Sequence, residues 1–320
     1  MIVLNGDDVR KHLPMATAIE LIDQVMVAVS DGKAHLPLRT AMDIDGVNKL
    51  GMMPGVLSEP PVYGVKLISL FPGNPSKGLS SHIGTMVLFD PDTGAPWAMV
   101  DADALTAIRT AAASAVATRA LSRTDAQVLA LVGTGEQAHT HLAAICAVRD
   151  IRQVRVAGRT PNRAVDFIDS VAARYPDIGF HAAADAQDAL CGADIVCTLT
   201  SSTTPVIRRD WIAAGTHVNA VGASVPSMQE IDTELVIASR LFTDYRPSAL
   251  AQARDIIAAI DSGAIEADHI LGEIGEVLAG RVQGRRSADD ITIYRSLGIA
   301  AQDLICARHA ALQAQPGEGK

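Results

Sequence analysis

The sequence predicts an α/β protein in which a doubly wound parallel sheet is joined to a second, α+β domain. Its 320 residues exceed the usual length of one domain, so two domains are expected. Between about residues 127 and 260, short apolar runs alternate with helical segments, which is typical of a parallel sheet covered on both faces. Before residue 125, the apolar runs are separated by short turns rich in glycine and proline, which favours antiparallel pairing.

The composition of the chain argues against some classes of binding partner. The chain carries 27 Lys and Arg residues against 36 Asp and Glu residues, a net charge of −9. Because a negative surface repels nucleic acids and anionic lipids, and aromatic residues make up only 3%, we expect neither nucleic acid nor membrane as a partner. A charged N-terminus and apolar runs well short of about 18 residues predict a cytoplasmic protein. The four cysteines form no CxxC pair, so no metal site is expected.

The first 125 residues are expected to start with a helix and continue as an antiparallel sheet. Pro14 and the Asp31-Gly32 pair mark the ends of a helix over residues 15–30. An alanine-rich stretch at 102–121 predicts a second, long helix. Apolar runs bounded by turns predict strands within 36–44, 48–53, 62–71, 84–90 and 96–101.

The parallel sheet is expected to follow directly. Pro161 is a favourable first residue for the helix after its second strand. The chain is expected to become helical again after about residue 262, with residues 291–312 forming the final helix. Short apolar runs predict the strands of this sheet at 127–132, 153–157, 178–182, 193–198, 216–221 and 239–244.

A glycine-rich turn of the form GxGxxA follows the first of these strands. Gly133 permits the tight turn, Gly135 lets the backbone approach a pyrophosphate, and Ala138 is small enough for close packing of helix and strand. The N-terminus of the next helix offers free N–H groups and a partial positive charge. The pattern predicts a Rossmann-type site for NAD(H) or NADP(H), with cofactor contacts at Gly133, Thr134, Gly135, Glu136 and Gln137.

The end of the second strand bears on the choice between the two cofactors. A site for NAD usually places Asp or Glu about 20 residues past the glycine-rich turn. Here the strand ends at Ala157 and is followed by Gly158, Arg159 and Thr160. Arg159 with Thr160 favours a 2′-phosphate and hence NADP(H). Two alternatives stay open, in which Arg159 stacks on the adenine or is a solvated loop residue.

Three cations lie among apolar residues in the first third of the chain. Lys66 is inside the predicted strand 62–71, Arg39 is in an extended segment, and Arg109 is in the alanine-rich helix. A buried cation needs a partner, and no acidic residue adjoins these three in sequence. Each taken singly is more simply a member of a structural ion pair, but beside a nucleotide domain they predict a shared carboxylate site. Lys66 can also exchange a proton if desolvation lowers its pKa.

Five segments together resemble the ornithine cyclodeaminase/mu-crystallin family over nearly the whole chain. They are residues 64–75 (GVKLISLFPGNP), 87–115, 132–138 (VGTGEQA), 219–232 (NAVGASVPSMQEID) and 273–304. The resemblance implies a Rossmann domain, residues 121–290, inserted into a substrate-binding and dimerisation domain formed by residues 1–120 and about 290–320. It also implies a homodimer.

The resemblance assigns roles to individual residues. It places Arg39, Lys66 and Arg109 on the carboxylate of the substrate, with Lys66 as the catalytic residue. Beyond the glycine-rich turn, the cofactor contacts that it implies fall on Ser81, Thr110, Arg159, Thr198, Val221, Gly222 and Ser296.

One departure from the family pattern bears on the reaction. Cyclodeaminases carry Asp where this chain has Ser224, and that acid is thought to orient and deprotonate the side-chain amine of ornithine. A serine supplies neither the charge nor the base, so the resemblance points instead to an NAD(P)H-dependent reductase of a small α-imino acid. The favoured substrate is iminosuccinate, reduced to aspartate, with Ser224 facing the substrate and His82, Ser80 and Ser81 near a second carboxylate.

Other functions stay open. Within the same reaction class, the alternatives are an alanine dehydrogenase and a cyclic ketimine reductase. Outside it, they are an ornithine cyclodeaminase, which is a lyase, and a non-catalytic, crystallin-like protein that binds a nucleotide.

Overall fold

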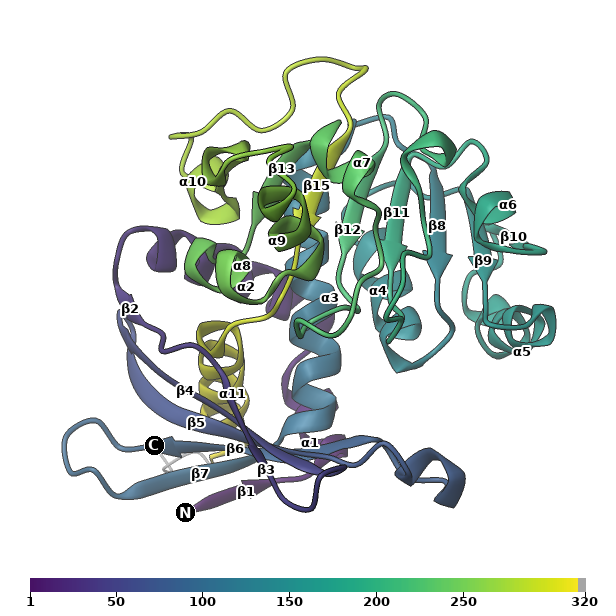
Figure 1. Ribbon diagram of the computed structural model, residues 1–320. Coiled ribbons are helices and arrows are strands. Elements are labelled where there is room, and N and C mark those ends of the chain that lie inside the picture. The colour runs from purple at the N-terminus through teal and green to yellow at the C-terminus, as the bar shows by residue number, and fades with distance from the viewer. Residues whose placement is uncertain (316–320) are drawn as a thin grey trace. The chain divides into compact units, whose positions relative to one another are not determined.

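The computed structural model describes residues 1–315 and divides the chain into two compact units (Figure 1). The terminal unit comprises Met1–Thr110 and the chain from Ile299 onward, and the inserted unit comprises Ala111–Gly298. Helix α3 (Ala102–Leu121) begins in the terminal unit and ends in the inserted one. The α/β class with a doubly wound parallel sheet is confirmed.

The terminal unit is built on a mixed sheet. Its strand order is β1-β7-β6-β5-β4-β2, with β3 also paired to β4, and only the β1–β7 pair is parallel. The strands are β1 (Ile2–Leu4), β2 (Ala34–His35), β3 (Thr40–Asp43), β4 (Lys49–Ser58), β5 (Pro61–Leu70), β6 (His82–Phe89) and β7 (Pro96–Asp101). Its other elements are α1 (Gly6–His12), α2 (Met15–Ser30), η1 (Asn74–Lys77) and α11 (Ala300–Ala314).

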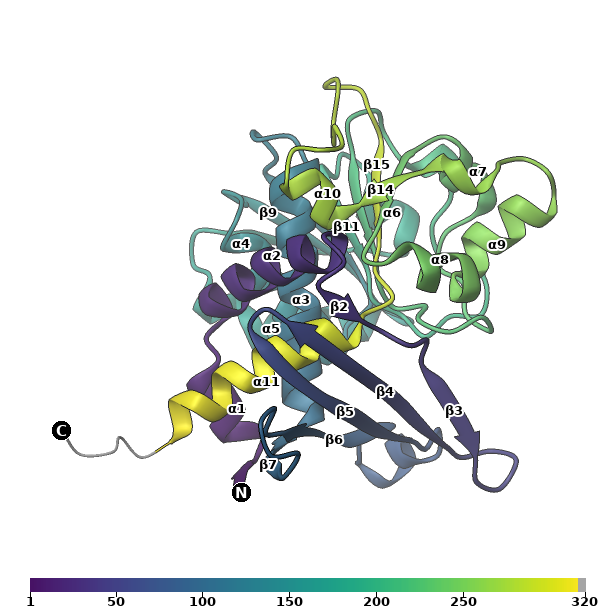
Figure 2. The same cartoon turned by 90° about the vertical axis from the view of Figure 1, so that its left-hand side faces the viewer.

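Helix α11 covers one face of this sheet and packs against β4, β5 and β6 (Figure 2). Alternate strand residues, including Val62 on β5 and Met86 on β6, are buried on that face. Gly55 on β4 permits the close approach, because a Cβ there would lie 2.9 Å from the Cβ of Ala300. The helix is buried nearly all round, which explains why it carries little hydrophobic periodicity.

The inserted unit contains a parallel sheet of eight strands in the order β10-β9-β8-β11-β12-β15-β13-β14. The strands are β8 (Val128–Val132), β9 (Gln153–Ala157), β10 (Gly179–Ala182), β11 (Ile195–Thr198), β12 (His217–Ala220), β13 (Arg240–Thr243), β14 (Ile270–Glu273) and β15 (Thr292–Arg295). The helices are α4 (Glu136–Cys146), α5 (Pro161–Val171), α6 (Ala186–Leu190), α7 (Thr233–Ile237), α8 (Arg246–Gln252), α9 (Arg254–Asp261) and α10 (Ile274–Leu278), and the 3₁₀ turns are η2 (Ala172–Arg174), η3 (Arg209–Trp211) and η4 (Ala267–His269).

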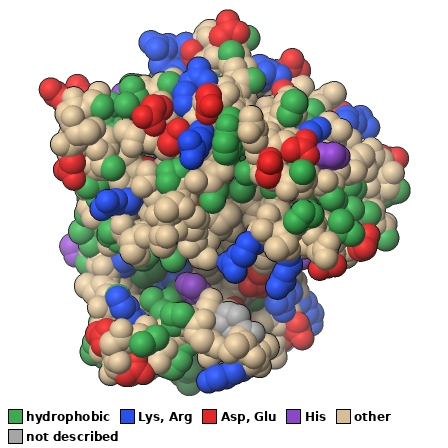
Figure 3. All heavy atoms as spheres, turned by 45° about the vertical axis from the view of Figure 1, so that its right-hand side comes forward, with side chains coloured by type: hydrophobic (Ala, Val, Ile, Leu, Met, Phe, Trp, Pro, Cys, Tyr) green, Lys and Arg blue, Asp and Glu red, His purple; other side chains and the backbone are tan. Residues whose placement is uncertain are grey.

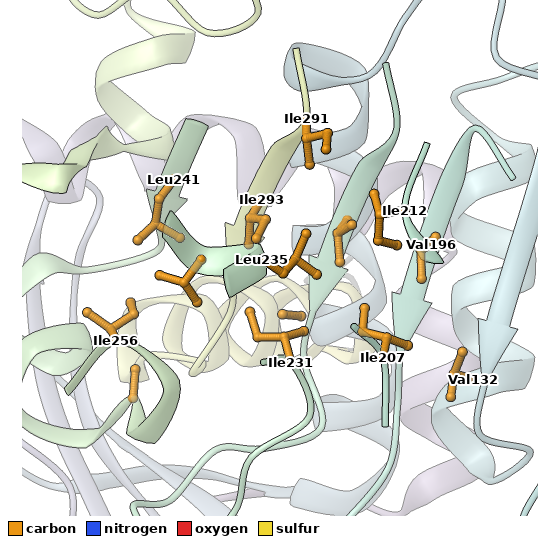
Figure 4. Packing of buried hydrophobic residues seen from close by; sticks show 14 of the residues in the cluster. Val132, Val196, Ile207, Ile212, Ile231, Leu235, Leu241, Ile256, Ile291 and Ile293 are labelled. Atoms are coloured by element: carbon orange, nitrogen blue, oxygen red, sulfur yellow. The ribbon is translucent and has the colours of Figure 1, made fainter. Parts of the chain in front are cut away.

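Both faces of the parallel sheet are buried, by alternating residues of the same strands. Leu129 and Leu131 of β8 pack with residues of α4 and α5. Ala130 and Val132 of the same strand belong to the opposite cluster, where Leu235, Leu241, Ile256 and Ile293 converge (Figure 4). This two-sided burial is why the strands read as continuous apolar runs.

The chain order reverses direction across the sheet between β8 and β11. Strands β9 and β10 extend to one side of β8, whereas β11 and β12 extend to the other. A site for a dinucleotide in such a sheet lies at the carboxyl ends of the strands at this switch point.

The predicted helices 15–30 and 102–121 are confirmed, and the predicted strands are found, although the strand expected at 48–53 continues to Ser58. The expected return to helix after about residue 262 is wrong in part, because Ile270–Glu273 form β14. The predicted final helix, 291–312, is wrong over its first part. Residues Thr292–Arg295 form β15, which lies between β12 and β13, and the helix begins at Ala300. The Thr-Ile-Tyr run suits a strand, since its β-branched and aromatic side chains are buried on both faces. The inserted unit begins at Ala111, where the prediction was 121, and it ends at Gly298, where the prediction was about 290.

Among residues 1–315, no single helix is both long and apolar enough to cross a membrane. Helices α1 and α2 pass that test of length and composition only when taken together, and they are bent by 79° at the break between them.

Candidate functional site

A buried cluster of charges lies in the terminal unit where β5, α3 and α11 meet. Asp303 of α11 forms an ion pair with Lys66 of β5, with Oδ2 2.8 Å from Nζ, and its Oδ1 accepts a hydrogen bond from Arg109 Nε of α3 at 2.9 Å. The side chains of Lys66 and Asp303 are 1% and 0% exposed, and that of Arg109 is 6% exposed. Two cations that the sequence singled out are thus brought together by an acid that it did not.

Strand geometry explains why Lys66 points inward. Val62, Gly64 and Lys66 alternate along β5 on the face that α11 covers. A buried ammonium group requires a counter-charge and hydrogen-bond acceptors. Asp303 supplies the counter-charge, and Thr106 Oγ1 lies 3.4 Å from Nζ as a weaker acceptor.

The guanidinium of Arg109 is held by two adjacent residues of α11. Asp303 Oδ1 accepts a hydrogen bond from Nε, and Gln302 Oε1 accepts one from Nη1 at 2.8 Å. Gln302 is itself oriented by Met26, whose Sδ lies 3.5 Å from its Nε2. Within the described part of the chain, Nη2 of Arg109 has no acceptor, so that edge of the guanidinium remains available to a ligand carboxylate.

The electrostatics of the cluster make Lys66 a group that can exchange a proton near neutral pH. Burial lowers the pKa of Lys66 to about 7, against the attraction of Asp303 and with the help of the positive charges of Arg109 and Arg39. Burial alone would raise the pKa of Asp303, but the charges of Arg109 and Lys66 lower it instead. Asp303 therefore stays ionised beside Lys66.

Arg39 and His82 belong to the surroundings of the same cluster. Arg39 is half-buried just before β3, and its charge acts on Lys66. His82 begins β6 on the face that carries Met86 and Lys66, and Ser81 Oγ lies 2.9 Å from its Nδ1. Desolvation and the charge of Lys66 lower the pKa of His82. All three predicted cations and His82 therefore interact within one unit.

The glycine-rich turn of the inserted unit has the geometry of a phosphate-binding loop. Gly133 has φ +121°, and a Cβ there would lie 2.7 Å from the carbonyl oxygen of Leu199. Its N–H donates to Ala157 of β9 at 2.8 Å, which ties the turn to the neighbouring strand. Gly135 caps α4 without a side-chain hydrogen bond and has open space where a Cβ would stand. The N-terminus of α4 therefore presents backbone N–H groups and the positive end of its helix dipole to an anion.

Several buried polar atoms of the predicted cofactor residues lack a partner. Gln137 Oε1 and Ser296 Oγ in the inserted unit, and Thr110 Oγ1 in the terminal unit, are buried without a hydrogen bond within residues 1–315. Buried hydroxyl and amide groups are normally satisfied. Gln137 Oε1 and Ser296 Oγ, together with the open space at Gly135, fit the polar groups of a dinucleotide bound to the inserted unit.

The remaining predicted cofactor residues differ in what they offer. Arg159 and Thr160 are exposed after β9, and Thr160 begins α5 with no side-chain cap. Thr198 is fully buried, its hydroxyl donates to Glu230, and its carbonyl oxygen accepts from the N–H groups of Val221 and Gly222. Val221 and Gly222 follow β12, with their N–H groups directed to Thr198 and Glu230.

Two buried acids, Asp303 in the terminal unit and Glu230 in the inserted unit, hold charged and polar groups together but were not predicted as site residues. Ser224 is half-buried in the loop after β12. Asp303 and Glu230 are 0% and 1% exposed, and the sequence pattern assigns neither of them a role. The signal for Asp303 was an acid in the alanine-rich first half of a helix, where charged residues are rarely buried without a partner.

The chain is similar to several solved structures over nearly its whole length. The solved structure of Thermococcus litoralis Delta(1)-pyrroline-2-carboxylate reductase with NADH and L-proline has a TM-score of 0.94 and 35% identity, covering 98% of this chain and 97% of that one. An archaeal alanine dehydrogenase dimer with bound NAD has a TM-score of 0.90 and 32% identity, covering 98% and 96%. The iminosuccinate reductase of Paracoccus denitrificans with NAD+ has a TM-score of 0.90 and 30% identity, with the same coverage. The model of the ornithine cyclodeaminase/mu-crystallin family matches residues 1–315, and the chain belongs to this family.

Proposed function

We propose that this protein is an NAD(P)H-dependent oxidoreductase that reduces the C=N bond of a small α-imino acid to give an L-amino acid. The observation that carries the proposal is the buried cluster of Lys66, Arg109 and Asp303, with Arg39 close enough to act on Lys66. Lys66 and Arg109 share the single carboxylate of Asp303, which leaves positive charge to attract a substrate carboxylate. Relatives that act on pyrroline-carboxylate, alanine and iminosuccinate support this class of reaction.

Within the cluster, the two arginines bind the substrate carboxylate and Lys66 transfers the proton. Arg109 offers Nη2 to the substrate carboxylate while Asp303 and Gln302 hold its plane in place. Arg39 adds a second positive charge beside the carboxylate. Lys66 holds a proton at Nζ for the imine nitrogen, and its pKa of about 7 suits both giving and regaining that proton. The bound nicotinamide supplies the hydride for the imine carbon.

The residues that would hold the cofactor lie mainly in the inserted unit. We assign the pyrophosphate to the backbone of residues 133–137 and the N-terminus of α4, and the adenosine ribose to Arg159 and Thr160. The unpartnered hydroxyls of Thr110 and Ser296 support their assignment as further contacts. Ser81, Thr198, Val221 and Gly222 complete the predicted set.

Iminosuccinate is the favoured substrate. It carries a second carboxylate, and His82 with Ser81 provides hydrogen-bonding groups close to Lys66. Ser224 stands as a neutral residue at the place where a cyclodeaminase would carry its acid. Alanine dehydrogenation and the reduction of cyclic ketimines are the alternatives within the same reaction class.

The proposed assembly is a cytoplasmic homodimer that pairs through the terminal units. The sheet face opposite α11 is apolar and partly open, with Val56 44% and Ile83 43% exposed and the Tyr63 and Phe89 rings stacked at 5.5 Å. Such a face is expected to be covered in solution. On the face shown in Figure 3, basic and acidic side chains are interspersed, which supports the expectation that nucleic acid is not a partner.

The test is oxidation of NADH and of NADPH with a panel of 2-oxo acids plus ammonia and of preformed cyclic imines. We expect turnover with a small imino acid and the highest kcat/KM with the four-carbon dicarboxylate. Turnover with no member of the panel, despite measurable cofactor binding, would favour the crystallin-like binding protein.

A further inference from the structure

A buried carboxylate in the inserted unit gathers an unusual number of hydrogen-bond donors. Glu230, which is 1% exposed, precedes α7. Its Oε1 accepts from the N–H of Thr200 at 2.6 Å and from the Thr200 hydroxyl at 2.7 Å. Its Oε2 accepts from the Thr198 hydroxyl at 2.9 Å, the Gly222 N–H at 2.7 Å and the Ala223 N–H at 3.1 Å. The three N–H groups can only donate and the two hydroxyls can also donate, so the site suits an ionised carboxylate. Burial raises the pKa of Glu230, and the hydrogen bonds from Thr200 and Thr198 act against that rise.

The donors come from two loops at the carboxyl edge of the sheet. Thr198 ends β11 and Thr200 follows it, whereas Gly222 and Ala223 follow β12. Both strands lie on the side of the switch point opposite to β9 and β10. The loop after β11 also contacts the glycine-rich turn, since a Cβ on Gly133 would meet the carbonyl of Leu199. Glu230 therefore joins the two loops at the second half of the dinucleotide site.

Close packing at Gly222 restricts how the loops after β11 and β12 can be arranged. A Cβ on Gly222 would lie 2.1 Å from the carbonyl oxygen of Thr200 and 2.7 Å from Glu230 Oε1. The neighbouring buried cation, Arg295, is engaged elsewhere, since it pairs with Asp255 at 2.9 Å and donates to the Ala223 carbonyl. Within the described residues the carboxylate is thus bound entirely by loop donors, and its loss would release both loops together.

We propose that Glu230 is a positioning residue that fixes the loops after β11 and β12 for the nicotinamide half of the cofactor. The inference rests on the proposed cofactor site, in which Thr198, Val221 and Gly222 are contacts. The adenosine half depends on the other side of the sheet, through the glycine-rich turn, Arg159 and Thr160. Glu230 should accordingly influence one half of the dinucleotide far more than the other.

The test is Glu230→Gln, which keeps the shape of the side chain. In either orientation, the new amide group faces the donors of one carboxylate oxygen, and backbone N–H groups cannot reverse their direction. We expect the Kd of NADH, measured by fluorescence and calorimetry, to rise about tenfold or more while the Kd of ADP-ribose changes less than about twofold. The same pair of measurements with NADPH and 2′-phospho-ADP-ribose covers the other cofactor. Glu234→Gln, an exposed site on α7, is the matched control and should change neither.

The outcomes separate the inference from the function on which it rests. Equal weakening of both ligands, or no change in either, would overturn the positioning role of Glu230 while leaving the cofactor site intact. A wild-type protein that binds neither ligand would overturn the cofactor proposal itself. If the Gln variant does not fold, Thr200→Val removes one donor and should weaken NADH about threefold without affecting ADP-ribose. An unchanged NADH affinity in that variant would also contradict the proposal.

Discussion

Asp303 Oδ2 lies 2.8 Å from Lys66 Nζ, and neither side chain is more than 1% exposed. This pair is the centre of the charge cluster, because the same carboxylate also holds Arg109. The burial of Lys66 lowers its pKa, and the ion pair with Asp303 limits how far the pKa falls.

Replacing Lys66 with Met should remove turnover while leaving the cofactor bound. Met is close to Lys in length but carries no charge or proton, so both the attraction for the carboxylate and the proton for the imine nitrogen are lost. We expect kcat/KM to fall by at least about 10³-fold, with the Kd of NADH or NADPH within about twofold of wild type. Lys33→Met, at an exposed site, is the control. Near-normal turnover in the Lys66 variant would exclude Lys66 from the mechanism.

The pH dependence of the reaction should follow the ionisation of Lys66. Its pKa of about 7 means that the proton-bearing form predominates below pH 7 and is lost as the pH rises through 7. Reduction needs that form, so kcat/KM for the imino acid should fall across this range, since kcat/KM reports the free enzyme. Oxidation of the amino acid needs the neutral amine and should rise over the same range. Parallel pH profiles in the two directions would contradict this assignment.

Replacing Asp303 with Asn should affect both stability and the pH profile. Two buried cations would lose their shared counter-charge, and the free energy of unfolding should fall by about 3 kcal/mol or more. Because the charge of Asp303 raises the pKa of Lys66, the fall in kcat/KM should move to lower pH. Urea unfolding and rate profiles measure the two effects. The control, Asp7→Asn, removes an exposed ion pair and should lower the free energy of unfolding by less than about 1 kcal/mol. An unchanged pH profile in the Asp303→Asn variant would show that the charge of Asp303 does not set the pKa of Lys66.

Replacing Arg159 with Ala should distinguish its possible roles in cofactor recognition. If Arg159 binds a 2′-phosphate, the loss of one charge-assisted hydrogen bond should raise the KM for NADPH about tenfold and change that for NADH little. Stacking on the adenine would raise both constants equally. A solvated loop residue would leave both unchanged. Arg152→Ala, an exposed arginine that pairs with Asp150 before β9, serves as the control.

The protein should form no proline from ornithine in the presence of NAD+. Ser224 offers no carboxylate to orient or deprotonate the δ-amine, so release of ammonia by that route lacks its base. Incubation with ornithine and NAD+, followed by amino-acid analysis, should show no proline above a heat-inactivated control. Proline production at a rate comparable to imine reduction would reassign the protein as a lyase.

The sequence alone determined the features that depend on local chemistry. Gly133 and Gly135 predict a phosphate loop, because a tight turn and a close approach of the backbone exclude larger side chains. Lys66 and Arg109 stood out because charges are rare among apolar residues. The helix at 15–30 was likewise predicted from Pro14 and the Asp31-Gly32 pair at its ends, and the helix at 102–121 from its high alanine content.

Only the tertiary structure decided which distant groups meet. Asp303 lies far along the chain from Lys66 and Arg109, and nothing in its local sequence shows that α11 brings it to β5 and α3. Glu230 similarly meets Thr198 and Gly222 only because β11 and β12 end side by side in the sheet. Residues 292–295 became a strand because burial between β12 and β13 outweighed their position beside a helix. Local propensities act over a few residues, whereas ion pairs and sheet neighbours are set by packing across the whole unit.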